Sequence, residues 1–208
     1  MRLGHITLAT VMGQRLVHSW VMARWKPNAP ERLAEAALAL FAERGYEATT
    51  VAEIAERAGL TKSTFFRYFA DKREVLFGGL TMDQLLAAGI AAAPPAATPL
   101  EAVANAFDLL GNDVFTPDRR QFSRRRRAVI AANPELQERE ALKGLRIGAA
   151  MVEALEQRGV PAITARVAAH VASLSLTMAY TRWSEGAEDF ADLARRSLTE
   201  LRAASASC

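Results

Sequence analysis

The hydrophobic residues of this 208-residue chain recur mostly three or four positions apart, and valine and isoleucine do not alternate with polar residues. Spacing of this kind is typical of helices that bury one face, whereas alternation would indicate half-buried strands. We therefore expect an all-helical protein. The chain is long enough for one large or two small domains with a proper core.

Two short helical patterns separated by a glycine occupy about residues 51–70. Thr50 and Glu53 have the spacing of a capping box, in which each side chain satisfies a free backbone N–H of the other residue. Gly59 interrupts the pattern and tolerates the left-handed conformation that most residues avoid. Thr61 can cap the second helix. Two short helices around a glycine turn indicate a helix-turn-helix, which places its second helix in the major groove of DNA.

Further helices are expected on both sides of this motif. The first covers residues 30–45, and the fourth covers residues 71–89 with an interruption at Gly78 and Gly79. Each glycine costs about 1 kcal/mol of helix propensity relative to alanine. The pair is either a hinge or a point of close packing against the first helix. After a loop, the remaining helices are expected over residues 99–110, 117–133, 134–158, 162–184 and 188–204.

These elements predict two domains with about nine helices in total. A three-helix head that contains the helix-turn-helix lies within residues 28–88, and a helical body lies within residues 89–208. The apolar residues before the head are interrupted by polar ones, and no cleavage site for a signal peptide follows them. We expect residues 1–27 to be a disordered extension or a mis-annotated start, with translation beginning at Met22.

Composition adds little evidence for a particular chemistry. The net charge of +3 is only weakly basic, so it is weak evidence for a nucleic-acid partner. The single cysteine, Cys208, allows no intrachain disulfide, and no apolar run approaches the length of a membrane span, so we expect a cytoplasmic protein. The histidines His5, His18 and His170 are isolated, and we find no assembled catalytic set, metal site or cofactor motif.

The segment ERLAEAALALFAERGYEATTVAEIAERAGLTKSTFFRYFADKREVL closely resembles the head of the TetR family of bacterial transcriptional regulators, of the TetR/AcrR type. The segment RRRRAVIAANPELQERE is more loosely similar to the bodies of actinobacterial members. The resemblance implies a homodimeric, ligand-responsive repressor that binds a palindromic operator on double-stranded DNA. It also implies that residues 28–88 are the DNA-binding domain and that residues 89–208 are a ligand-binding and dimerisation domain. A small apolar or amphiphilic effector would release the DNA, and the last two helices would form the dimer.

The candidate DNA contacts lie in the head, mostly on the second helix of the motif. Short hydroxyl side chains at the start of a helix can approach base edges, and cations and tyrosine can contact phosphate. Lys72 matches the phosphate-binding lysine of the family, and Phe66 stands where the family usually has tyrosine. A plain capping role for Thr61 and Thr64 is the alternative. The full set is Thr50, Thr61, Lys62, Ser63, Thr64, Phe66, Arg67, Tyr68 and Lys72.

The candidate effector pocket consists of large apolar residues and one arginine in the body, for which ordinary core packing is the alternative. They are Phe107, Leu110, Phe122, Arg126, Met151, Leu155, Leu174, Met178 and Trp183. Residues 162–184 are apolar on more than one side, which predicts a second subunit as a packing partner. The expected dimer contacts are Val167, Val171, Leu176, Tyr180, Leu193 and Leu198.

Two questions stay open at this point. The arginines from Arg124 to Arg127 either form a solvated stripe with ion pairs to nearby glutamates or bind an anionic group of a ligand. The competing functions are a helical small-molecule or lipid-binding protein or enzyme, and a constitutive DNA-binding protein without a ligand. Sequence-selective binding to a palindrome, and its release by a small molecule, would separate these alternatives.

Overall fold

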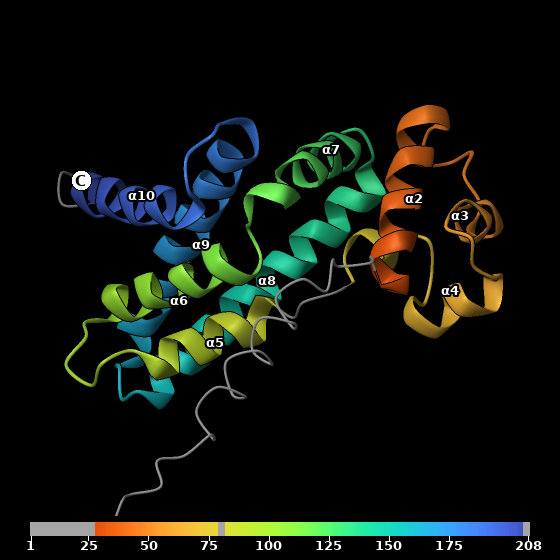
Figure 1. The fold of residues 1–208 in the computed structure, drawn as a ribbon. Coiled ribbons are helices and arrows are strands. Elements are labelled where there is room, and N and C mark those ends of the chain that lie inside the picture. Colours follow the sequence, from red (N-terminus) through yellow and green to blue (C-terminus); the bar gives the residue numbers. More distant parts are fainter. Residues whose placement is uncertain (1–27, 79–81, 206–208) are drawn as a thin grey trace, which may run out of the picture.

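The computed structural model describes residues 28–78 and 82–205. Within these ranges the protein consists of nine α-helices and two short 3₁₀ helices, and it contains no strands (Figure 1). The prediction of an all-helical protein is confirmed. The predictions for residues 1–27, for Gly79 and for Cys208 fall outside the described residues.

The head consists of α2 (Ala29–Arg44), α3 (Val51–Arg57) and α4 (Lys62–Tyr68), which lie together at one end of the molecule (Figure 1). The body follows, and its helices form the rest of the molecule. Its elements, with the connecting 3₁₀ helix η1, are η1 (Arg73–Leu76), α5 (Met82–Ala92), α6 (Pro99–Asp113), η2 (Pro117–Arg119), α7 (Arg120–Ala131), α8 (Pro134–Gln157), α9 (Ala162–Glu185) and α10 (Phe190–Ser205).

N-terminal capping residues determine where the helices of the head begin. Asn28 accepts a hydrogen bond from the backbone of Glu31 at 3.1 Å and so begins α2. The capping box of Thr50 and Glu53 is present at α3, with the Thr50 N–H donating to the Glu53 carboxylate at 2.8 Å. Thr61 caps α4 by a hydroxyl that accepts a hydrogen bond from the backbone N–H of Thr64, without a capping box. Each cap satisfies backbone N–H groups that the helix itself leaves unpaired.

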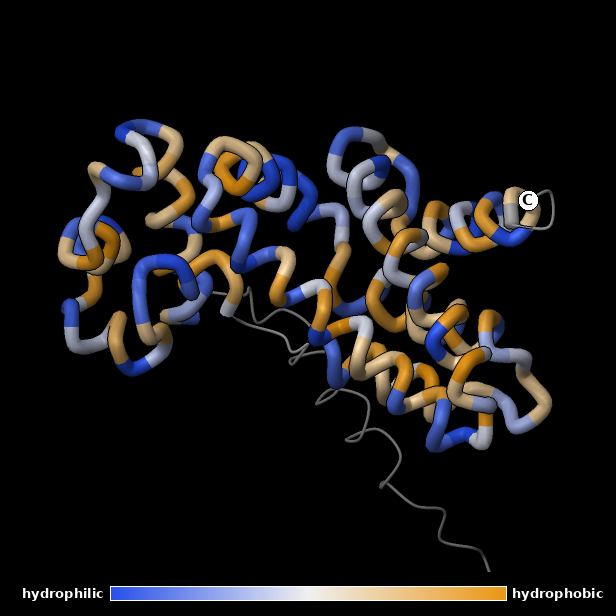
Figure 2. Tube along the Cα trace, turned by 180° about the vertical axis from the view of Figure 1, so that it is seen from behind, coloured by the Kyte–Doolittle hydropathy of each residue, from blue (hydrophilic) through white to orange (hydrophobic). Residues whose placement is uncertain are grey.

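Two hydrophobic cores divide the chain, but not at the predicted boundary. The first core joins the head to Val129 and Ile130 of α7 and to Leu136 of α8. The second core occupies the body and includes Leu86 and Ile90 of α5. The boundary predicted near residue 88 therefore falls inside α5, and body helices complete the core of the head. Figure 2 shows hydrophobic and hydrophilic positions following each other along the helices, as expected when each helix buries one face.

The single helix expected over residues 71–89 is wrong. A 3₁₀ helix ends at Leu76, and α5 begins only at Met82. A Cβ atom on Gly78 would lie 2.2 Å from the ring of Phe69, so glycine is required for this close approach. Gly78 thus packs against the end of α4, and not against the first helix of the head.

Tertiary packing also extends α6 beyond residue 110, where the predicted helix ends. Helix α6 continues to Asp113, and the backbone of Gly111 faces Ala191 of α10, where a Cβ atom would approach within 3.2 Å. The helix expected from Pro117 begins as the 3₁₀ helix η2 and becomes α-helical at Arg120. The low helix propensity of a single glycine therefore does not end a helix where that helix packs closely against another.

Helix α9 departs from the expectation that no segment approaches a membrane span. By length and composition alone, it is the one helix in the described ranges that is long and apolar enough to cross a membrane, with a mean hydropathy of 1.2. Only a third of that apolar stretch is buried, although α9 packs against α8, α10 and α7. The helix therefore has one apolar side in the body core and another on the surface.

Candidate nucleic-acid interface

Helix α4 buries one face in the head and exposes the opposite face to solvent. Phe65 is fully buried and Phe69 nearly so, and their rings pack 5.5 Å apart. Phe66 and Tyr68 are 49% and 43% exposed, although they are large and aromatic. Such side chains are usually covered by a partner, because their exposure to water is unfavourable. The outward face of α4 therefore has the character of a binding surface.

The hydroxyl groups at the start of α4 are linked to each other. Thr61 accepts a hydrogen bond from the backbone N–H of Thr64 at 3.1 Å, and their two hydroxyl oxygens lie 2.9 Å apart. Ser63 is exposed and points away from the head core. Thr50 is also exposed, and its hydroxyl donates to Glu53 at 2.8 Å. The threonines thus cap their helices, and whether they also contact bases stays a prediction.

The free positive charge of the head is concentrated on α4. Among the described residues, Lys62 and Arg67 have no carboxylate partner, and Arg67 donates instead to the Tyr68 hydroxyl at 3.1 Å. Arg32 of α2 donates to the backbone carbonyls of Ala58 and Gly59 in the turn of the motif, and three other arginines of the head are neutralised by ion pairs. These pairs are Arg44 with Glu53, Arg57 with Glu43, and Arg73 with Asp71 and Glu135. A nearly neutral head therefore presents a locally basic face, which suits an anionic partner.

Lys72 is held inside the head. Its ammonium group donates to the backbone carbonyl of Tyr46 at 2.7 Å and lies 4.0 Å from the centre of the Tyr46 ring. Each ammonium has three donors, so two remain available for a phosphate. The phosphate contact assigned to Lys72 stays a prediction, with the lysine anchored in a fixed position.

The residues predicted to form an effector pocket do not surround one cavity in the described part of the chain. Most are packed in the body core, where Phe115 and Phe190 contact the ring of Trp183. Phe122 packs against the core of the head, and Leu174 is 52% exposed on α9. The fully buried members are Phe107, Leu110, Met151, Leu155 and Trp183. Their assignment to a pocket stays a prediction.

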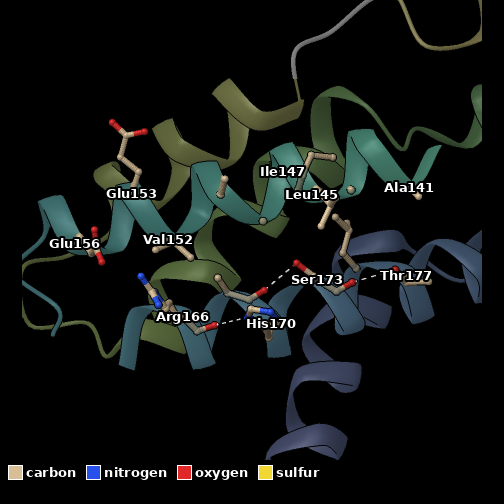
Figure 3. Close-up of a pocket in the computed structure, with 15 residues that line it drawn as sticks. Ala141, Leu145, Ile147, Val152, Glu153, Glu156, Arg166, His170, Ser173 and Thr177 are labelled. Carbon is tan, nitrogen blue, oxygen red and sulfur yellow. Dashed lines mark hydrogen bonds between the residues drawn. The ribbon is translucent and has the colours of Figure 1, made fainter. Parts of the chain in front are cut away.

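A groove of about 710 Å³ lies between α8 and α9 (Figure 3). Its floor is formed by small and apolar residues, and its rims carry opposite charges. Glu153 and Glu156 lie along α8, whereas Arg166 lies along α9. None of the predicted pocket residues lines this groove, and Leu176 is the one predicted dimer contact that does.

The arginines of α7 connect elements within the subunit. Arg125 pairs with Glu35 of α2, Arg126 with Glu140 of α8, and Arg127 with Glu185 of α9. Arg124 is exposed, with no hydrogen-bond or ion-pair partner among the described residues. The expectation of ion pairs to nearby glutamates thus holds for Arg126, whereas the other two pairs reach elements far along the chain. These long-range partners follow from the topology, which the sequence pattern does not specify.

The residues predicted to form the dimer differ in exposure. Leu193, Leu198 and Leu176 are buried within the subunit, whereas Val167 is 57% exposed. Val171 and Tyr180 are partly buried against the body core.

No group of three histidine, cysteine, aspartate or glutamate side chains that could hold a metal ion occurs within the described ranges.

Comparison with known sequences identifies the head. Residues 33–78 match the family model for bacterial regulatory proteins of the tetR family. The transcriptional regulator TcmR of Streptomyces glaucescens is 40% identical over 78 residues, which cover 37% of this chain and 34% of TcmR. The repressor KstR2 of Mycobacterium tuberculosis is 48% identical over 44 residues, which cover 21% of this chain and 22% of KstR2. The matches thus span about a third or less of the length of these relatives.

Comparison with solved structures extends the likeness to the body. SmeT, the repressor of a multidrug efflux pump of Stenotrophomonas maltophilia, matches with a TM-score of 0.53 and 19% identity over 84% of this chain and 89% of SmeT. A transcriptional regulator from Aquifex aeolicus matches with a TM-score of 0.52 and 17% identity over 84% of this chain and 98% of its own. At this identity the likeness is one of fold. The head therefore matches the tetR family of bacterial regulatory proteins in sequence, and most of the chain shares the fold of such regulators.

Proposed function

We propose that this protein is a DNA-binding transcriptional regulator, a repressor that binds a palindromic operator as a homodimer and is released by a small molecule. The observation that carries the proposal is the outward face of α4. There, Lys62 and Arg67 stand beside the exposed Phe66 and Tyr68, free of carboxylates among the described residues. Base edges and phosphates supply the acceptors that these groups can contact in a major groove.

The proposal includes a cytoplasmic location and no enzymatic activity. Operator DNA in bacteria lies in the cytoplasm, and the family consists of DNA-binding regulators. Selection of binding sites from random double-stranded DNA tests the function directly. We expect the wild-type protein to enrich a palindrome. Enrichment of no sequence, or only of non-symmetric ones, would contradict the proposal.

The surface of α8 and α9 supports the homodimer. Among the described residues, seven large hydrophobic side chains are exposed, of which two are the aromatic residues on α4. The other five lie on α8 and α9, and we call them the α8–α9 apolar face: Leu142, Leu145, Ile163, Val167 and Leu174. An exposed apolar cluster of this kind marks an interaction site.

Charge and symmetry favour a second copy as the occupant of this face. The acidic residues of α8 and the basic Arg166 of α9 line opposite rims of the groove that the face borders (Figure 3). In a two-fold dimer, the acidic rim of one subunit can face the basic rim of the other. The outer side of α10 is charged, with Arg195 and Arg196 exposed and paired with acidic residues. The dimer proposed here therefore uses α8 with α9, in place of the last two helices.

Introducing a charge into the α8–α9 apolar face should separate the subunits. Val167→Glu places a carboxylate where the proposed dimer buries an apolar side chain, and an unpaired buried charge is strongly unfavourable. We expect sedimentation equilibrium to report a monomer for this variant and a dimer for the wild type. Thr199→Glu, at an exposed position on α10, is the matched control and should remain dimeric. A dimeric Val167→Glu protein would contradict the assignment of this face.

Removing a phosphate-contacting cation from α4 should weaken DNA binding in a salt-dependent way. For Arg67→Ala we expect the slope of log affinity against log salt concentration to fall by about two in magnitude on the palindrome, because each of the two subunits loses one phosphate contact. Fluorescence anisotropy at several salt concentrations measures this slope. Arg57→Ala is the control, because Arg57 is already paired with Glu43 and should leave the slope unchanged. Equal slopes for wild type and Arg67→Ala would exclude this contact.

A further inference from the structure

Phe66 is the one exposed side chain of α4 that carries no polar atom. The other exposed residues of this helix are Lys62, Ser63, Arg67 and Tyr68, each of which can form hydrogen bonds. The Phe66 side chain is 49% exposed. Because contact between a large apolar ring and water is unfavourable, Phe66 gains free energy when an apolar group of a partner covers it.

The rest of α4 holds the Phe66 ring in place. The ring packs edge-on against the fully buried ring of Phe65, with the ring centres 5.5 Å apart and the planes at 80° to each other. The ammonium of Lys62, one helical turn earlier, lies 5.9 Å from the centre of the Phe66 ring. These contacts restrict the rotation of the ring, so little side-chain entropy is lost when a partner binds it.

Tyr68, the other exposed aromatic residue of α4, differs from Phe66 because it has a hydroxyl group. That hydroxyl accepts a hydrogen bond from Arg67 at 3.1 Å, and the Arg67 guanidinium lies 4.9 Å from the centre of the Tyr68 ring. Tyr68 and Arg67 thus form a polar pair that suits a phosphate. Phe66 can neither donate nor accept a hydrogen bond through its side chain, so the group that it contacts is apolar.

The major groove of B-DNA presents a single kind of apolar group on its base edges, which is the C5-methyl group of thymine. The other groups on those edges are hydrogen-bond donors and acceptors, which Phe66 cannot pair. The faces of the bases are covered by the neighbouring base pairs of the duplex. A phenylalanine ring on a helix that enters this groove therefore favours thymine over the other three bases.

We propose that Phe66 recognises one thymine in each half of the operator through the C5-methyl group of that base. This inference rests on the function proposed above and names the base that one residue of α4 selects. Phe66 is then a specificity-determining residue. The cations Lys62 and Arg67 beside it supply phosphate contacts, which position the helix but do not depend on the base sequence.

Replacing thymine by deoxyuridine removes only the methyl group and tests this inference on the full-length chain. The duplexes are the selected palindrome and variants of it in which one thymine of each arm, at symmetry-related positions, is replaced by deoxyuridine. Each such pair of positions is substituted in turn, and fluorescence anisotropy measures the affinity. At one or more pairs we expect the wild type to lose affinity about fourfold for each methyl group, and so about fifteenfold when both arms are substituted.

Two variants show whether Phe66 makes the methyl contact. At one of these pairs, Phe66→Ala should bind the thymine and deoxyuridine duplexes equally, because the ring that covers the methyl group is gone. Tyr68→Ala is the matched control, since it removes the other exposed ring of α4, and it should keep the full difference between the two duplexes. The titrations are made at low salt, where phosphate contacts keep the weaker complexes measurable.

The inference and the proposed function can fail separately. A selected palindrome without thymine in its arms, or without methyl dependence at any thymine, would overturn the inference and leave the proposed function intact. Methyl dependence that persists at every such pair in Phe66→Ala would assign the contact to another residue and would also overturn it. If no palindrome is enriched, both proposals are wrong.

Discussion

Phe65→Ala is expected to lower the free energy of unfolding by about 3 to 5 kcal/mol, the range measured when a buried phenylalanine is truncated in a core. Phe65 is fully buried in the first core and contacts the rings of Phe66 and Phe69. Because it anchors α4 on the head, the variant should also lose operator binding. Urea denaturation followed by circular dichroism measures the change in stability.

The neighbouring Phe66 provides a matched control with the same substitution on the opposite side of α4. Its side chain is 49% exposed, so Phe66→Ala should change the free energy of unfolding by no more than about 0.5 kcal/mol. It should still weaken DNA binding if the exposed ring contacts the duplex. Similar destabilisation by both substitutions would contradict the conclusion that α4 packs against the rest of the head through Phe65.

Arg126→Met is expected to destabilise the protein by about 3 kcal/mol, at the lower end of the range for a broken buried ion pair, because Glu140 keeps 38% of its side chain exposed. The substitution removes hydrogen bonds to Glu140 and to the Leu76 carbonyl. Thermal and urea denaturation measure the loss. Arg124→Met is the control on the same helix, because Arg124 is exposed and should leave stability within about 0.5 kcal/mol of the wild type.

The pH dependence of this effect has a definite sign. Burial alone raises the pKa of Glu140, but the charge and hydrogen bonds of Arg126 outweigh it and hold the pKa below its ordinary value of 4.5. The stabilisation from this pair is therefore present above pH 4.5 and is lost as the pH falls through the lowered pKa. The stability difference between wild type and Arg126→Met should narrow in acid. A difference that stays constant from neutral pH down to pH 3 would contradict the role assigned to this pair.

The head was largely predictable because its local interactions are encoded within a few residues. The capping box at Thr50, the cap at Thr61 and the buried pair Phe65 and Phe69 all follow from short spacings, and all are present. The other helices of the described ranges were predictable for the same reason, with the exception of α5, whose start at Met82 the spacing did not indicate. Periodicity also indicated that residues 162–184 have two apolar sides, which α9 bears out.

The body sites were less predictable because they depend on contacts between distant elements. A large apolar residue such as Met151 has the same helical spacing in a core as in a pocket, and the structure buries it in the core. The partners of Arg126 depend on how α7, α8 and η1 meet.

The central claim is that two copies of α4 bind two arms of one operator. Anisotropy titrations of the selected palindrome, of a duplex with one arm scrambled and of a fully scrambled duplex test it most directly. The account predicts two chains per palindrome, affinity reduced at least about tenfold by scrambling one arm, and about a thousandfold by scrambling both, as for specific over non-specific DNA binding. One chain per duplex, or equal affinity for all three duplexes, would contradict it.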